Sequence, residues 1–153
     1  MSTNNSSNTD ELPLLTFNSL YNLLREEKKN KSLQKLPQGF YTSLRKFLDE
    51  KRKEVKNLKD KEEKRDTLLK EKKVLDNSKK MAEEFLNLRL TKISKIATKN
   101  SIFEEEVLSE ENIIEEELDY FDNLKDILDK TKGDLLKKWQ DNTVKKMKKF
   151  FYW

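Results

Sequence analysis

Apolar residues recur along most of the chain at intervals of three and four, the spacing of one face of an α-helix. The first such stretch carries Phe17, Leu20, Tyr21 and Leu24. A short connection through Leu36 and Pro37 follows, because the residue before a proline is disfavoured in the α region. A second helix is predicted from about Gly39. Its apolar positions are Phe40, Tyr41, Leu44, Phe47, Leu48, Val55 and Leu58.

The apolar stripe of this second helix thins between residues 51 and 80. That stretch carries 13 Lys and Arg against 7 Asp and Glu. A helix of this composition is held by i,i+4 ion pairs rather than by packing. We therefore expect a long second helix that partly projects into solvent or contacts something outside the domain. Asn77-Ser78 is either a break before the next helix or part of a continuous one.

Residues 79–99 are predicted to form the most buried helix, since apolar groups cover more than half of its circumference. Arg89 and Lys92 lie inside this apolar stretch, close to Ile93. A buried basic group needs a carboxylate partner, and the acidic helix expected over 109–130 can supply one.

The pattern predicts that this acidic helix opens at Ser109 as N-cap, with glutamates in its first turn. It presents Ile113, Ile114, Glu117, Leu118, Phe121, Leu124, Ile127 and Leu128. Gly133 is a natural C′ residue at its end. Residues 132–153 then form a basic amphipathic segment with Leu135, Leu136 and Trp139 near one face.

Together these elements predict an all-α bundle of four to five helices. Residues 1–15, rich in Ser, Asn and Thr, are predicted to be a disordered tail, because they bury too little apolar surface to offset their ordering entropy. A helical domain follows over 16–131. With only 2 Gly and 2 Pro among 153 residues, the chain has little turn chemistry for a β-sandwich or barrel.

Composition narrows the chemistry. The chain has neither Cys nor His, which removes disulfides, the usual zinc sites, thiol nucleophiles and histidine acid–base catalysis. The glutamates at 104–106 and 115–117 lack the spacing of an EF-hand or a di-metal site. We expect no metal, no cofactor and no enzymatic activity. We also expect a cytoplasmic protein, because the first residues do not resemble a signal peptide and no apolar run is long enough to span a membrane.

Charge is segregated along the sequence. Residues 51–80 and 132–153 are net basic, whereas 101–131 carry 12 acidic residues. This pattern fits either separate docking faces for partners or ordinary solvated helix faces. Most aromatic side chains fall on the apolar stripes and are expected in the core. Trp139 and the terminal Phe-Phe-Tyr-Trp favour a partner or self-association, with a membrane surface as an alternative.

Two stretches resemble a known family. Leu20-Tyr21-Asn22-Leu23-Leu24-Arg25-Glu26-Glu27 leads into Leu33-Gln34-Lys35-Leu36-Pro37-Gln38-Gly39-Phe40-Tyr41. Downstream come Arg89-Leu90-Thr91-Lys92-Ile93-Ser94-Lys95-Ile96-Ala97 and an acidic helix after Leu108-Ser109-Glu110-Glu111. The ordered set, over about residues 17–130, is similar to GINS subunits, archaeal and eukaryotic DNA replication factors, of the type whose helical domain comes first. Members of that type usually continue into a β-rich domain, and nothing here resembles its strands.

The resemblance implies a non-enzymatic scaffold. GINS subunits assemble as homo- or hetero-tetramers and join the replicative MCM helicase with a RecJ/CDC-type companion. It further implies nucleoid association in an archaeon or nuclear localisation in a eukaryote, with indirect or weak DNA contact and no membrane. The candidate interface or structural residues are Leu20, Tyr21, Leu24, Leu36, Pro37, Phe40, Tyr41, Arg89, Lys92, Ile93 and Trp139.

Two alternatives stay open. The first is a coiled-coil-like adaptor without a replication role, which would self-associate through the long helix. The second is a basic helical nucleic-acid binder that uses residues 132–153, whose binding would weaken steeply with salt.

Overall fold

The computed structural model describes residues 14–103 and 110–151. Within these ranges the chain forms four α-helices, one short 3-10 helix and no strand, which confirms the all-α bundle. The elements are α1 (Phe17–Lys29), α2 (Phe40–Leu58), η1 (Glu62–Lys64), α3 (Arg65–Phe103) and α4 (Glu115–Phe151). Nearly all of the predicted tail lies outside the described residues, as do Ser109 and the glutamates at 104–106. The predicted helix start at Ser109 is wrong, because residues 110–114 are not helical and α4 begins at Glu115.

Helix α1 begins with a capping box. The Thr16 side chain accepts from the backbone N–H of Ser19 at 3.1 Å, and the Ser19 hydroxyl accepts from the Thr16 N–H at 2.7 Å. Such reciprocal bonds satisfy donors that the first turn of a helix leaves unpaired. They fix the start of α1 at Phe17, so that Leu20, Leu24 and Glu27 turn inward.

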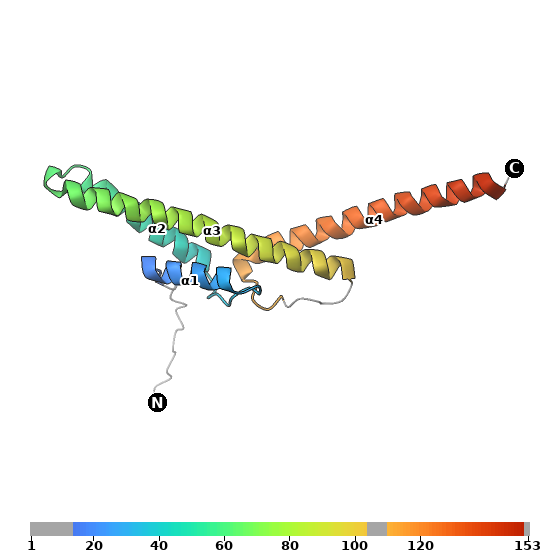
Figure 1. Cartoon of the computed structure of the whole chain (residues 1–153), viewed down its shortest axis with the longest axis horizontal. Helices are drawn as coiled ribbons and strands as arrows, with labels where there is room; N and C mark the ends of the chain where they lie inside the picture. The colour runs from blue at the N-terminus through green and yellow to red at the C-terminus, as the bar shows by residue number, and fades with distance from the viewer. Residues whose placement is uncertain (1–13, 104–109, 152–153) are drawn as a thin grey trace, which may run out of the picture.

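The long second helix expected from the sequence is instead a hairpin. α2 ends at Leu58, and the chain turns through η1 and runs back as α3 (Figure 1). No apolar side chain lies between Lys59 and Asp66, so a turn there removes nothing from the core. Folding back instead buries Val55 of α2 and Leu75 of α3, at 7% and 8% exposed. The projecting part of the molecule at this end is therefore the tip of two helices.

Helix α3 is central, as predicted for residues 79–99. It packs against α1, α2 and α4, and it lies along the middle of the molecule (Figure 1). Asn77-Ser78 does not interrupt it. The Ser78 side chain is fully buried and donates its hydroxyl to the Val74 carbonyl at 2.7 Å, which satisfies the group within the helix.

Two apolar clusters hold the helices. The first joins α1, α2 and α3 around Phe40, whose ring centroid lies 5.1 Å from that of Phe85. The second joins α3 and α4 around Ile93 and Phe121. Leu36 and Ile114 extend the first cluster into the connecting segments, and Leu33 and Ile113 extend the second.

Gly133 does not end the last helix, so this prediction is wrong. α4 begins at Glu115 and continues through Gly133 to Phe151. A glycine in a helix interior costs about 1 kcal/mol relative to alanine, and the Lys and Leu neighbours are good helix formers that offset it. The part of α4 after residue 132 extends away from the other helices (Figure 1). No helix in the described part of the chain is long and apolar enough to cross a membrane.

Candidate functional site

Arg89 lies at the centre of a polar cluster in the interior. Its side chain is fully buried, and its Nε and Nη2 donate to the two carboxylate oxygens of Glu117 at 3.0 and 2.6 Å. Nη1 donates to Glu27 Oε1 at 3.1 Å. The backbone carbonyls of Gln34 and Asn112 accept the other two bonds, at 2.8 and 2.9 Å. A guanidinium has five N–H donors, and five bonds are formed.

The Glu117 carboxylate accepts hydrogen bonds from two further donors. The Tyr41 hydroxyl donates to its Oε2 at 2.7 Å, and the backbone N–H of Ile114 donates to its Oε1 at 3.2 Å. Glu117 is only 3% exposed. It therefore exchanges water for protein donors from α2, α3 and the start of its own helix.

The Glu27 carboxylate, on the α1 side of Arg89, is also bonded by protein donors. Its Oε2 accepts from the backbone N–H of Gln34 at 3.2 Å and lies 3.4 Å from Lys92 Nζ. Lys92 also donates to the carbonyls of Glu27 and Ser32, at 2.6 and 3.1 Å. We call Glu27, Tyr41, Arg89, Lys92 and Glu117 the buried arginine cluster. All four helices contribute to it, and its two cations balance its two carboxylates.

The surroundings keep Arg89 and Tyr41 protonated. Burial lowers the pKa of Arg89, but the hydrogen bonds and charges of Glu117 and Glu27 outweigh it, so the pKa is raised. Burial, followed by the bond to Glu117 and its charge, raises the pKa of Tyr41 well above its usual 10.0. Tyr41 thus remains a neutral donor over the pH range in which proteins work.

The amino ends of α2 and α4 cap each other beside this cluster. The Glu116 carboxylate accepts from the backbone N–H groups of Tyr41 and Thr42 at 2.9 and 3.1 Å. In return, the Gln38 side chain accepts from the backbone N–H of Glu115 at 3.2 Å. Glu116 thereby supplies the cap that Gly39, which has no side chain, cannot give to α2.

The structure divides the predicted site residues into three groups. Leu20, Leu24, Leu36, Phe40 and Ile93 are buried in the two apolar clusters. Tyr41, Arg89 and Lys92 meet in the buried arginine cluster. The last group, Tyr21, Pro37 and Trp139, is exposed. The core position predicted for Tyr21 is therefore wrong, because its ring is 53% exposed beside the buried Leu20 and Leu24.

Sequence reasoning expected a carboxylate from the acidic helix, and Glu117 is that partner. It missed Glu27, although a signal was present. Glu27 follows Leu20 by seven residues and Leu24 by three, so it continues the buried face of α1. An acidic residue at such a position indicates a buried cation opposite.

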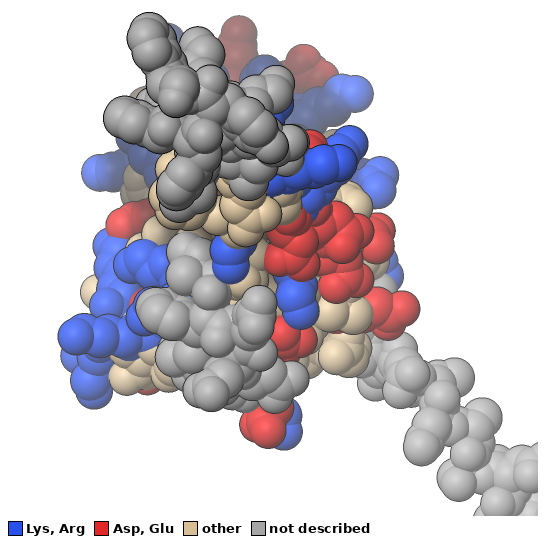
Figure 2. Space-filling view, turned by 90° about the vertical axis from the view of Figure 1, so that its right-hand side faces the viewer, with Lys and Arg blue, Asp and Glu red and all other residues tan. Residues whose placement is uncertain are grey.

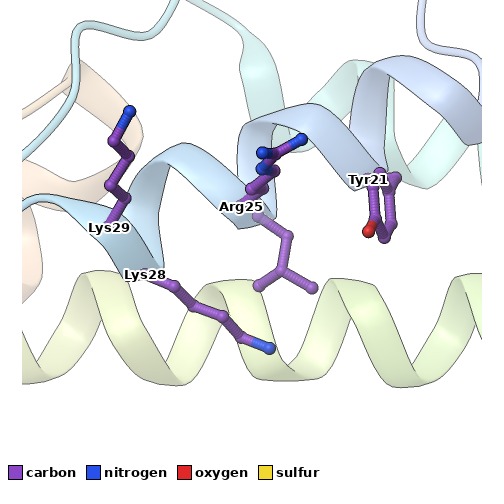
Figure 3. A pocket seen from close by; sticks show the side chains of 5 residues that line it. Tyr21, Arg25, Lys28 and Lys29 are labelled. Carbon is purple, nitrogen blue, oxygen red and sulfur yellow. The ribbon is translucent and has the colours of Figure 1, made fainter.

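The exposed Tyr21 borders a shallow pocket on the surface of α1, with a volume of about 320 Å³. Leu24, Arg25, Lys28 and Lys29 complete its lining, and α3 runs alongside (Figure 3). Lys28 forms an ion pair with Glu84 of α3 at 2.5 Å. Both side chains are about half exposed, so the pair contributes little to stability.

The interior cluster and the surface pocket differ in what they can do. Arg89, Glu27 and Glu117 of the buried arginine cluster are closed to solvent and the Arg89 donors are bonded, so the cluster fixes the positions of helices rather than binding a ligand. In the part of the chain that the structure describes, no group of three or more acidic residues is placed to hold a metal ion. Among the described residues, the surfaces open to a partner include this pocket and the exposed end of α4.

Comparisons with known proteins give no match: no family model, curated protein or solved structure is similar to this chain.

Proposed function

We propose that this protein is a non-enzymatic assembly subunit, and that the assembly is a GINS-type complex acting with the replicative MCM helicase. The main observation in favour of an assembly role is that the end of α4 exposes apolar side chains. Leu135 and Trp139 are 60% and 68% exposed, and Leu136 is 41% exposed. Half of a 37-residue helix extending from a small bundle is stabilised little by the bundle itself, and a partner can cover these side chains.

The two stretches that resemble GINS subunits contact each other in the structure, and this supports the GINS-type role. The first stretch supplies Glu27, Gln34 and Tyr41, and the second supplies Arg89 and Lys92. These residues are distant in sequence, yet Arg89 bonds to Glu27 and to the Gln34 carbonyl. A shared architecture would require the two stretches to meet in this way, and that is the support they give to the proposal.

The test is recovery of the tagged, full-length chain from the cells that make it, followed by mass spectrometry of stoichiometric partners after nuclease treatment. The proposal expects MCM or a second GINS-type subunit. Recovery of the chain alone contradicts the replication role and favours the coiled-coil-like adaptor. Loss of the partners on nuclease treatment would instead favour the nucleic-acid binder.

A matched pair of variants tests whether the end of α4 makes the contact. Leu135→Glu should abolish partner recovery, because it places a charge within the apolar contact. Leu69→Glu is the control, since Leu69 is 61% exposed near the amino end of α3, away from the end of α4. Equal recovery with both variants would show that the end of α4 is not the contact surface.

A further inference from the structure

No contact within one chain explains why position 133, inside a helix, is a glycine. It lies at the midpoint of α4, eighteen residues from Glu115 and eighteen from Phe151. Among the described residues, nothing lies within 4 Å of where a Cβ at this position would be. Glycine disfavours a helix more than any residue except proline. A glycine that nothing in its own chain approaches suits a close approach by another backbone.

The charges of α4 are distributed about the same point. Residues 115–132 carry seven acidic and three basic side chains, whereas residues 134–151 carry six lysines and two aspartates. The two halves therefore have net charges of −4 and +4. Two copies of α4 aligned antiparallel, with Gly133 against Gly133, would place each half against its electrostatic complement.

The nearest residues on the Gly133 face agree with this arrangement. Asp129 and Lys137 lie four residues before and after Gly133, so both lie on its face of the helix. Both are exposed. A two-fold axis through Gly133 brings Asp129 of one copy opposite Lys137 of the other, twice. Leu136, 41% exposed, is three residues from the axis and supplies apolar contact beside it.

Figure 2 shows the end of the molecule toward which α4 points, where Asp and Glu gather in one patch and Lys and Arg lie around it and on the opposite side. A uniform surface of one sign would repel a second copy. A segregated one favours a single relative orientation of two copies.

We infer that α4 pairs with α4 of a second copy of this chain, antiparallel and with the two-fold axis at Gly133. The inference rests on the proposed assembly role and names its partner, but it does not depend on replication. An isologous contact of this kind is the commonest way in which identical chains pair.

Sedimentation equilibrium of the full chain tests the inference. We expect a dimer whose dissociation constant rises with salt concentration, because exposed charges are screened. Gly133→Leu should raise that constant at least about tenfold by blocking the close approach, and circular dichroism should show that the helices remain. A chain that stays monomeric at low salt, or a dimer unaffected by Gly133→Leu, would overturn the inference.

Charge variants test the orientation. Lys137→Asp places like charges opposite each other and should weaken the dimer about tenfold. Lys138→Asp makes the same change one residue along, on another face, and should leave the constant within about twofold. Mixing the Lys137→Asp protein with the Asp129→Lys protein should restore association, because both cross pairs are then opposite in sign. Failure of the mixture to associate more tightly than either variant alone would rule out this register.

The two proposals can fail separately. A monomer that still recovers a GINS-type subunit from cells overturns the self-pairing and leaves the proposed function. A dimer with the expected variant effects, recovered alone from cells, keeps the self-pairing and contradicts the replication role.

Discussion

Arg89 and Glu117 form a two-bonded ion pair, at 3.0 and 2.6 Å, with side chains 0% and 2% exposed. Such a pair gains little net stability over apolar residues of the same size, because desolvation offsets the attraction. Removing one member is different, since it leaves the other charge buried without its partner. The pair therefore specifies how α4 docks on α3 more than it stabilises the docking.

Replacing Arg89 should be among the most damaging single changes. Arg89→Met leaves Glu117 buried without its cation and Glu27 with Lys92 alone, and we expect a loss of about 3–5 kcal/mol in the free energy of unfolding. Chemical denaturation measures it. The control is Lys28→Met, which breaks the half-exposed pair with Glu84 and should cost at most about 1 kcal/mol. Comparable losses in the two variants would show that Arg89 is not buried as described.

Tyr41 makes the stability depend on alkaline pH. Its pKa is raised above 10.0 in the folded protein, mainly by burial and by Glu117. Unfolded chains therefore lose this proton first as the pH rises above about 10. Stability from the Tyr41 proton is fully present below that pH and is lost above it, by up to about 1.4 kcal/mol per pH unit.

Tyr41→Phe lacks this proton. Wild type should be the more stable protein at pH 8, by about 1.5–3 kcal/mol for a bond to a charged group. The advantage should shrink between pH 10 and 11.5, as measured by thermal unfolding at each pH. A difference that stays constant across this range would contradict the assignment.

Phe40 anchors the first apolar cluster and has no exposed surface. Its ring centroid lies 5.1 Å from that of Phe85 and 5.3 Å from that of Tyr41. Phe40→Ala should cost about 3–5 kcal/mol, through lost burial and the cavity that remains. Tyr21→Ala, at a half-exposed ring on α1, should cost far less. A Phe40→Ala protein with an unchanged thermal midpoint would show that this side chain is not in the core.

Glu116 caps α2 from another helix. Glu116→Ala leaves the N–H groups of Tyr41 and Thr42 without this acceptor, and should cost about 0.5–2 kcal/mol. Glu115→Ala removes a charge from the same first turn of α4 and no bond to α2. The difference between the two variants measures the bonds from α2 to Glu116, which include one from the Thr42 hydroxyl, and equal losses would assign the effect to the charge near the helix end.

The sequence predicted helices and core well where apolar residues recur regularly. Phe40, Leu24 and Ile93 are buried as expected, because a 3.6-residue stripe leaves them few other positions. The prediction failed where no apolar residue constrained the chain. Lys59–Asp66 is as compatible with a turn as with a helix, and only the burial of Val55 and Leu75 decides for the turn.

The polar interior was predictable in part. Arg89 within an apolar helix indicates a carboxylate partner, and the acidic helix was the evident source. The place of Glu27 on the buried face of α1 indicates a buried cation, but that this cation is Arg89 could not be predicted, because the turn between α2 and α3 is not marked in the sequence. The continuation of α4 through Gly133 likewise could not be predicted from the glycine alone, because the helix propensity of the neighbouring Lys and Leu residues offsets the cost of one glycine.

The order of synthesis determines when the buried arginine cluster can form. Glu27 and Arg89 leave the ribosome before Glu117, which follows Arg89 by 28 residues. At about 5–20 residues per second, the unfinished chain spends roughly 1–6 s with Arg89 synthesised and its bidentate partner still missing. Until then α1, α2 and α3 cannot close around a satisfied arginine. The compact state therefore becomes accessible only once the start of α4 has emerged.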